Sequence, residues 1–132
     1  MTARIHSLWL MPAPADEAML AGIVGDLSGR FDTPVFAPHL TLLGDTETPP
    51  AALERTVTTV AETVEAFSEP VTAVEGIESY FRSFYARFAA SAPLTTLKRT
   101  LDPQDSTSFM PHVSLLYGAV EPSAKAAAIA EI

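Results

Sequence analysis

Apolar and polar positions divide the chain into segments with strand-like and helix-like patterns. An apolar run over residues 5–11 ends at a proline and predicts a buried strand. Apolar residues at three- and four-residue steps over 20–31 predict a helix, with Asp16 as its N-cap. A Thr-Pro-Pro start at 48–50 and an apolar stripe over 53–67 predict a second helix.

The second half of the chain shows the same mixture of patterns. Residues 71–77 and 80–88 are typical of two strands separated by a short break. Leucines at helical spacing over 94–101 predict a third helix, and Pro122 opens a fourth over 124–132. With 132 residues in all, the chain has the length of one domain.

Two segments outside these elements resemble each other. They are Pro38-His39-Leu40-Thr41-Leu42-Leu43-Gly44 and Pro111-His112-Val113-Ser114-Leu115-Leu116-Tyr117-Gly118. Both follow the order proline, histidine, apolar residue, hydroxyl residue and two leucines. This repeat predicts that the chain consists of two related halves.

A strand places the polar residues of each motif together, because successive side chains point to opposite faces. His39 and Thr41 then share one face, about 7 Å apart along the strand, and the aliphatic residues face the core. His112 and Ser114 do the same in the second motif. If an approximate two-fold relates the halves, two imidazoles and two hydroxyls converge on one group. Such an arrangement is suited to cleaving a phosphate ester, because one imidazole can serve as base and the other as acid while the hydroxyls donate to the phosphate oxygens.

The paired motifs resemble the signatures of the two-histidine phosphoesterases, and within them the cyclic phosphodiesterases. The opening Ser-Leu-Trp-Leu-Met-Pro at 7–12 and the segments 36–42 and 112–117 are similar to that family in order and spacing. The resemblance implies a bilobed α+β fold, in which two pseudo-symmetric lobes of antiparallel sheet with outer helices enclose a central cleft. It covers residues 1–132 as a single domain. Family members continue beyond the helix after the second motif, so we expect an incomplete second lobe or strands from elsewhere, another chain included, along that edge.

The same resemblance assigns roles to residues. His39 and His112 are implied as catalytic acid and base, and Thr41 and Ser114 as phosphate-binding residues. Tyr117 matches a tyrosine that lines the nucleotide pocket. The implied activity needs no metal and no cofactor. It opens a nucleoside 2′,3′-cyclic phosphate to the 2′-phosphate, or ADP-ribose 1″,2″-cyclic phosphate to the 1″-phosphate.

Strand parity qualifies the role of Tyr117. On a regular strand its side chain shares the face of Val113 and Leu115. We therefore expect Tyr117 to reach the histidines only if the strand ends or bulges near Gly118.

Composition narrows the class of partner. Sixteen acidic against eight basic residues give a net charge of -8, the wrong sign for a long nucleic acid, so we expect a small cyclic-phosphate nucleotide as substrate. We also expect a cytoplasmic monomer or weak dimer without membrane contact, since no apolar stretch approaches the length of a membrane span. Cysteine is absent, and the three histidines lack metal-ligand spacing, which disfavours a metal site.

Other interpretations stay open. The chain could be a binding module that holds the same ligand without catalysis. It could be an enzyme acting on RNA ends, which would need a basic surface. It could also be a structural domain, in which the motif histidines would lie far apart. His6 is expected to be structural and Trp9 to lie in the core. Arg82 and Tyr85 are further candidates for ligand contact because their segment mixes aromatic and basic residues.

Overall fold

In the part of the chain that the structure describes, five strands form one antiparallel sheet in the order β1-β2-β5-β4-β3. The computed structural model describes residues 4–105 and 109–132. The elements along the chain are β1 (His6–Leu10), α1 (Pro14–Phe31), β2 (Leu40–Thr46), α2 (Pro50–Ala61), β3 (Val71–Glu75), β4 (Phe84–Phe88), α3 (Ala92–Leu101), β5 (His112–Leu116) and α4 (Pro122–Glu131). The predicted α+β class with an antiparallel sheet and outer helices is confirmed.

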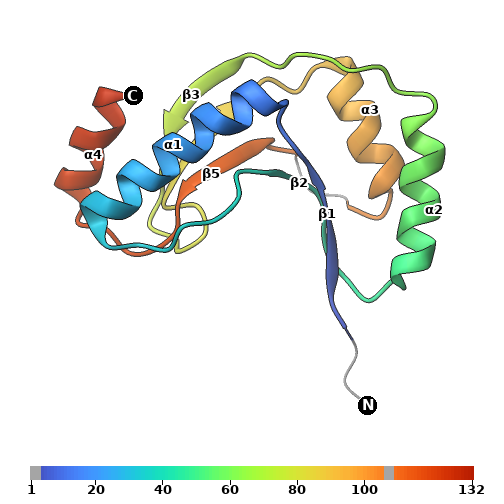
Figure 1. Cartoon of the computed structure of the whole chain (residues 1–132), viewed down its shortest axis with the longest axis horizontal. Coiled ribbons are helices and arrows are strands. Elements are labelled where there is room, and N and C mark those ends of the chain that lie inside the picture. The colour runs from blue at the N-terminus through green and yellow to red at the C-terminus, as the bar shows by residue number, and fades with distance from the viewer. Residues whose placement is uncertain (1–3, 106–108) are drawn as a thin grey trace.

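The sheet falls into two halves that meet at β2 and β5. Figure 1 shows an arch, with α1 and α4 at one end and α2 and α3 at the other. Within the described residues, Leu40↔Val113 is the one registered pair between β2 and β5. Helix α1 contacts β5 on one side of this seam, and α3 contacts β2 on the other. Each motif of the repeat therefore lies on one of the two seam strands.

The core lies on one face of the sheet. Alternate residues of β2, β4 and β5 point to this face, and α1, α3 and α4 cover it. Their buried side chains are Leu40, Leu42, Phe84, Ala86, Val113, Leu115 and Leu116 from the strands, and Leu20, Val24, Leu27, Leu94, Leu97, Leu101 and Ala128 from the helices. Burying each of the larger side chains contributes roughly 1.5–3 kcal/mol. The motif histidines and hydroxyls have the opposite parity, so they lie on the other face, which we call the site face.

Three differences from the predicted elements are larger than a shift of one or two residues or change the assigned cap. Asp16 is in the first turn of α1 and is not its cap, because Pro14 starts the helix and Ala13 is the N-cap. Helix α2 ends at Ala61, and the apolar residues predicted to continue its stripe pack on the core from irregular backbone. The second predicted strand of the pair over 71–88 begins only at Phe84, because residues 76–83 form a loop.

Gly76 explains where this β3–β4 loop begins. A Cβ at this position would lie 2.0 Å from the carbonyl oxygen of Ser83, so only glycine allows the two backbone segments to come so close. The Ile77 N–H donates to the Arg82 carbonyl, 3.0 Å away, and closes the loop.

No helix in the described part of the chain combines the length and apolarity that crossing a bilayer requires.

Candidate active site

The register of β2 against β5 brings the two motifs together. Leu40 and Val113, the central apolar residues of the motifs, are directly paired in antiparallel strands. Continuing this register by one residue in each direction sets His39 opposite Ser114, and Thr41 opposite His112. On this register the two histidines are diagonal neighbours on the site face, a relation that separates residues by about 7–8 Å. The repeat thus forms a local two-fold, with all four polar side chains on one side of the sheet.

Both imidazoles are held in the same way by their own backbone. Nδ1 of His39 donates to the Ala37 carbonyl, 2.7 Å away, and Nδ1 of His112 donates to the Met110 carbonyl, 3.0 Å away. A carbonyl oxygen can only accept, so Nδ1 carries a hydrogen in both rings. Nε2 is therefore the ring atom of each histidine that is left to exchange protons with a ligand. Both rings are partly exposed.

The aromatic neighbours of the two histidines differ. The Trp9 indole stacks on His39, with ring centroids 3.5 Å apart and 14° between the planes. Trp9 reaches this position because it pairs with Thr41 in the β1–β2 ladder and so stands on the site face. The prediction that Trp9 lies in the core is wrong, since this residue is 48 % exposed. Tyr85 instead meets His112 edge to face, at 5.3 Å and 62°.

Tyr85 links His112 to a charged pair on β3 and β4. Its hydroxyl donates to Glu75 Oε1 at 3.0 Å, and the Arg87 guanidinium lies 3.4 Å from the same oxygen. Burial raises the pKa of Tyr85, Glu75 raises it further, and the Arg87 and Arg82 charges oppose the shift. The phenol consequently stays protonated and keeps donating at neutral pH.

Arg87 is a site-face residue that the sequence analysis missed. It pairs directly with His112 in the β4–β5 ladder. Strand parity was the available signal, because Arg87 is two residues from the candidate Tyr85 and must share its face. The other candidate, Arg82, is exposed in the β3–β4 loop, and its charge reaches Tyr85.

The two motif hydroxyls have different surroundings. Thr41 is exposed on β2. Ser114 is buried, and its hydroxyl donates to the Phe81 carbonyl of the β3–β4 loop at 2.9 Å. A serine hydroxyl has one hydrogen. Ser114 can therefore donate to a ligand only by releasing Phe81, whereas Thr41 is open to it.

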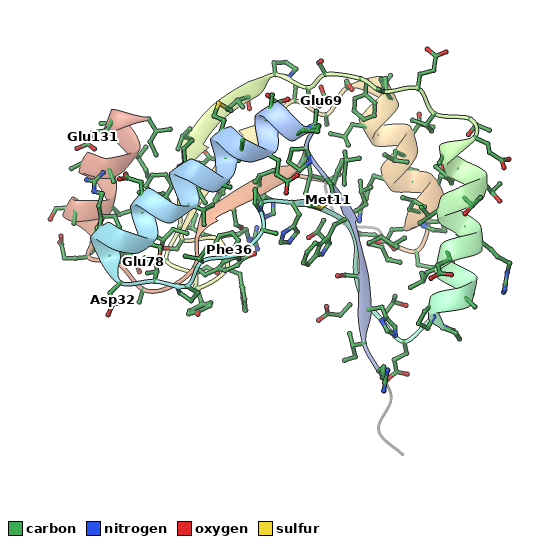
Figure 2. The ribbon with its side chains drawn as sticks, in the orientation of Figure 1. Met11, Asp32, Phe36, Glu69, Glu78 and Glu131 are labelled. Atoms are coloured by element: carbon green, nitrogen blue, oxygen red, sulfur yellow. The ribbon has the colours of Figure 1, made fainter. Side chains whose placement is uncertain are left out.

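Tyr117 lies in a group of four rings beside Ser114, which we call the aromatic cluster. Its ring stacks on Phe36 at 3.9 Å, meets Phe81 edge to face at 5.3 Å, and lies nearly parallel to Tyr80 at 6.3 Å. In Figure 2, Phe36 lies below β5, on the inner side of the arch. Burial raises the pKa of Tyr117, and the nearby Ser114 hydroxyl opposes that shift.

An irregularity within β5 allows this position of Tyr117. Tyr85 pairs with Ser114 but Phe84 pairs with Leu116, so Leu115 is an extra residue in the ladder. Leu116 therefore shares the core face with Phe84, and Tyr117 follows on the site face. The strand ends at Leu116, and Gly118 has φ +131°, a conformation that side chains rarely adopt. The Gly118 N–H donates to the Tyr80 carbonyl, 2.9 Å away. The irregularity that parity required near Gly118 is thus present, as the extra residue Leu115 in β5.

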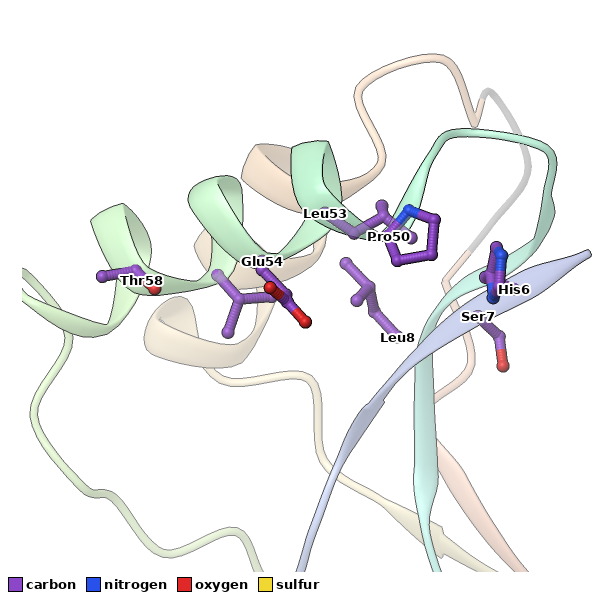
Figure 3. A pocket seen from close by; sticks show the side chains of 8 residues that line it. His6, Ser7, Leu8, Pro50, Leu53, Glu54 and Thr58 are labelled. Carbon is purple, nitrogen blue, oxygen red and sulfur yellow. The ribbon is translucent and has the colours of Figure 1, made fainter.

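His6, the third histidine, lies apart from the motif residues. It pairs with Thr46 near the outer end of the β1–β2 ladder. It also lines a cavity of about 420 Å³ between β1 and α2, together with Glu54 and Leu53. Figure 3 shows Leu8 of β1 pointing toward α2 across this cavity. Over residues 4–105 and 109–132, no three histidine, aspartate or glutamate side chains gather as a metal-binding group.

Comparison with known proteins adds one finding. A family model described as cyclic phosphodiesterase-like protein matches residues 4–132, which include both motifs and every element of the sheet. No curated protein matches the chain.

Proposed function

The chain belongs to the cyclic phosphodiesterase-like family, and from this premise we propose that it hydrolyses a small cyclic phosphodiester with His39 and His112 as acid and base. The family supports phosphoesterase chemistry in general. The observation that carries the assignment of residues is the Leu40↔Val113 pairing, because it sets both imidazoles on one face as diagonal neighbours.

The proposed step divides two proton transfers between the imidazoles. Nε2 of one neutral histidine takes a proton from water as the water oxygen forms its bond to phosphorus. The bond from phosphorus to one sugar oxygen breaks in line with this attack, and Nε2 of the other, protonated histidine gives that oxygen its proton. Each transfer contributes about 10² to 10⁴ in rate. Exchange with solvent then restores the starting protonation.

Neighbouring residues position the phosphate and the nucleoside. We expect the Thr41 hydroxyl to donate to a non-bridging oxygen, where negative charge develops. Ser114 adds a second donor when it exchanges its bond with the Phe81 carbonyl. Tyr117 has one face on Phe36, and we expect it to contact a base or sugar. We propose nucleoside 2′,3′-cyclic phosphates and ADP-ribose 1″,2″-cyclic phosphate as substrates, in a monomer or weak dimer that needs no metal.

A matched set of histidine variants tests this function. The protein is incubated with both substrate types, and the products are separated to identify the broken bond. His39→Ala and His112→Ala should each lower kcat by about 10²-fold or more while the protein stays folded. His6→Ala, the control, should keep the rate of the unchanged protein. Binding without turnover by the unchanged protein would indicate a binding module, and near-full rate in either motif variant would exclude the acid–base assignment.

A further inference from the structure

A second cavity lies where the β3–β4 loop meets the turn between β5 and α4. Its volume is about 350 Å³, and its walls include Tyr80, Ser83, Gly118 and Lys125. None of the four motif residues lines it. We call it the loop cavity. Two buried polar side chains in its wall, Ser83 and Lys125, have fewer partners than buried groups normally have.

Ser83 supplies a hydroxyl without a partner. The residue is 1 % exposed, and within the described residues its Oγ has no hydrogen-bond partner. Leaving a buried hydroxyl unpaired costs about 1–3 kcal/mol. Such a group in the wall of a cavity can donate to a ligand and accept from it.

Lys125 supplies a buried positive charge. The residue is 8 % exposed, and its Nζ donates to the Ile77 carbonyl at 3.1 Å. This bond uses one of three ammonium hydrogens. In residues 4–105 and 109–132, no carboxylate lies within 4.0 Å of this Nζ. Lys98, the other lysine, has Asp102 at 2.8 Å, so the two lysines differ in this respect.

The negative groups near the loop cavity leave this charge uncompensated. Glu121 accepts from the N–H groups of Ser123 and Ala124, and so is committed to the start of α4. Glu78 lines the cavity, but its side chain is exposed. Water screens an exposed carboxylate, whereas a buried ammonium favours a bound counter-ion.

We propose that the loop cavity is an anion site that takes a phosphate group, with Lys125 Nζ and Ser83 Oγ as donors. A phosphate oxygen accepts from both, which compensates the buried charge and pairs the hydroxyl. This proposal concerns binding and does not depend on catalysis at the histidines.

The loop cavity is close enough to the site face to serve the same substrate. Tyr80 lines the cavity, and its ring is nearly parallel to that of Tyr117, at 6.3 Å and 11°. Gly118, also in the wall, follows Tyr117 directly. A nucleotide with its cyclic phosphate at the histidines and its nucleoside on Tyr117 could place a second phosphate here. This extension rests on the proposed function, and free inorganic phosphate is the other source of the same group.

Inorganic phosphate is the probe for the site itself. It is titrated into the His39→Ala/His112→Ala protein, where the site-face histidines are gone, and binding is followed by calorimetry and amide NMR shifts. Saturable binding should persist and shift resonances of the β3–β4 loop. Ser83→Ala and Lys125→Met, each added to that protein, should weaken it at least tenfold, while the exposed control Arg99→Met leaves it unchanged.

Stability separates a binding role from a structural one. Ser83→Ala removes an unpaired hydroxyl, so it should keep or raise the Tm even as it weakens phosphate binding. If Lys125→Met fails to fold, the Ser83→Ala variant alone tests the proposed anion site. The proposal is overturned if the His39→Ala/His112→Ala protein binds no phosphate saturably, or if the folded Ser83→Ala variant binds it unchanged.

Substrate kinetics then distinguish the two sources of phosphate. Adenosine 2′,3′-cyclic phosphate is compared with its 5′-phosphorylated form on the unchanged protein and on Ser83→Ala. If the 5′-phosphorylated compound has the lower KM on the unchanged protein but not on Ser83→Ala, the loop cavity binds a phosphate of the substrate. Equal KM values, with inorganic phosphate still bound, assign it to free phosphate. If neither compound is hydrolysed, the proposed function fails, and the phosphate titration still tests whether the loop cavity binds phosphate.

Discussion

The two motif hydroxyls should respond differently to removal, although they occupy equivalent positions in the repeat. Thr41 is exposed, so Thr41→Val should leave the Tm nearly unchanged. It removes a hydrogen bond to a charged phosphate, worth about 1.5–3 kcal/mol, which corresponds to a loss of about 10- to 150-fold in kcat/KM. In Ser114→Ala the lost bond is the 2.9 Å bond to the Phe81 carbonyl. This bond is neutral and contributes about 0.5–1.5 kcal/mol to folding.

The assay measures kcat/KM and thermal unfolding on the same preparations. For a domain of this length, losing the Ser114 bond should lower the Tm by about 2 to 5 °C. We expect a smaller loss of kcat/KM in Ser114→Ala than in Thr41→Val, because Ser114 must first give up Phe81. An equal loss of kcat/KM in both variants, with no loss of Tm in Ser114→Ala, would refute this reasoning and make Ser114 a direct phosphate donor.

Three further perturbations test other parts of the structure. Trp9→Leu removes the ring stacked on the first motif histidine, so kcat should fall by about 2- to 10-fold with little change in Tm; an unchanged kcat would contradict a positioning role. Because the pKa of Tyr85 is raised, this residue contributes fully to the free energy of unfolding below pH 10, and the contribution is lost as the pH rises above 10. The free energy of unfolding, measured with denaturant, should therefore fall less steeply at alkaline pH in Tyr85→Phe. Gly76→Ala would place a methyl group 2.0 Å from the Ser83 carbonyl and should lower the Tm strongly, whereas the control Gly22→Ala, with open space around it, should raise stability by about 1 kcal/mol; similar Tm values would argue against the close approach.

The pH prediction follows from the sign of the shift. Tyr85 holds its proton more tightly in the folded state than in the unfolded chain. Above pH 10 the unfolded state therefore loses this proton first, which favours unfolding. Phenylalanine at this position cannot titrate, so the difference between the two proteins isolates this contribution.

Local sequence patterns were sufficient to predict the fold class and to locate the two motifs. Strand parity depends only on the backbone of a single strand, so the sequence places each motif histidine on the same face as its hydroxyl two residues later. Proline starts such as those of α2 and α4 depend only on local backbone preference. The same parity argument required an irregularity near Gly118, and the β4–β5 register has one at Leu115.

Only the tertiary structure decided how the motifs meet and what surrounds them. The Leu40↔Val113 pairing joins strands that are far apart in the sequence, and no local pattern specifies such a register. The same is true of Trp9 on His39, which depends on β1 pairing with β2. Ser114 and Thr41 look equivalent in the repeat, yet only Ser114 faces a loop carbonyl, because the β3–β4 loop crosses one half of the site and has no counterpart at Thr41 in the described residues. Side-chain parity is a property of one strand, whereas partners across strands and loops arise from the packing of the whole chain.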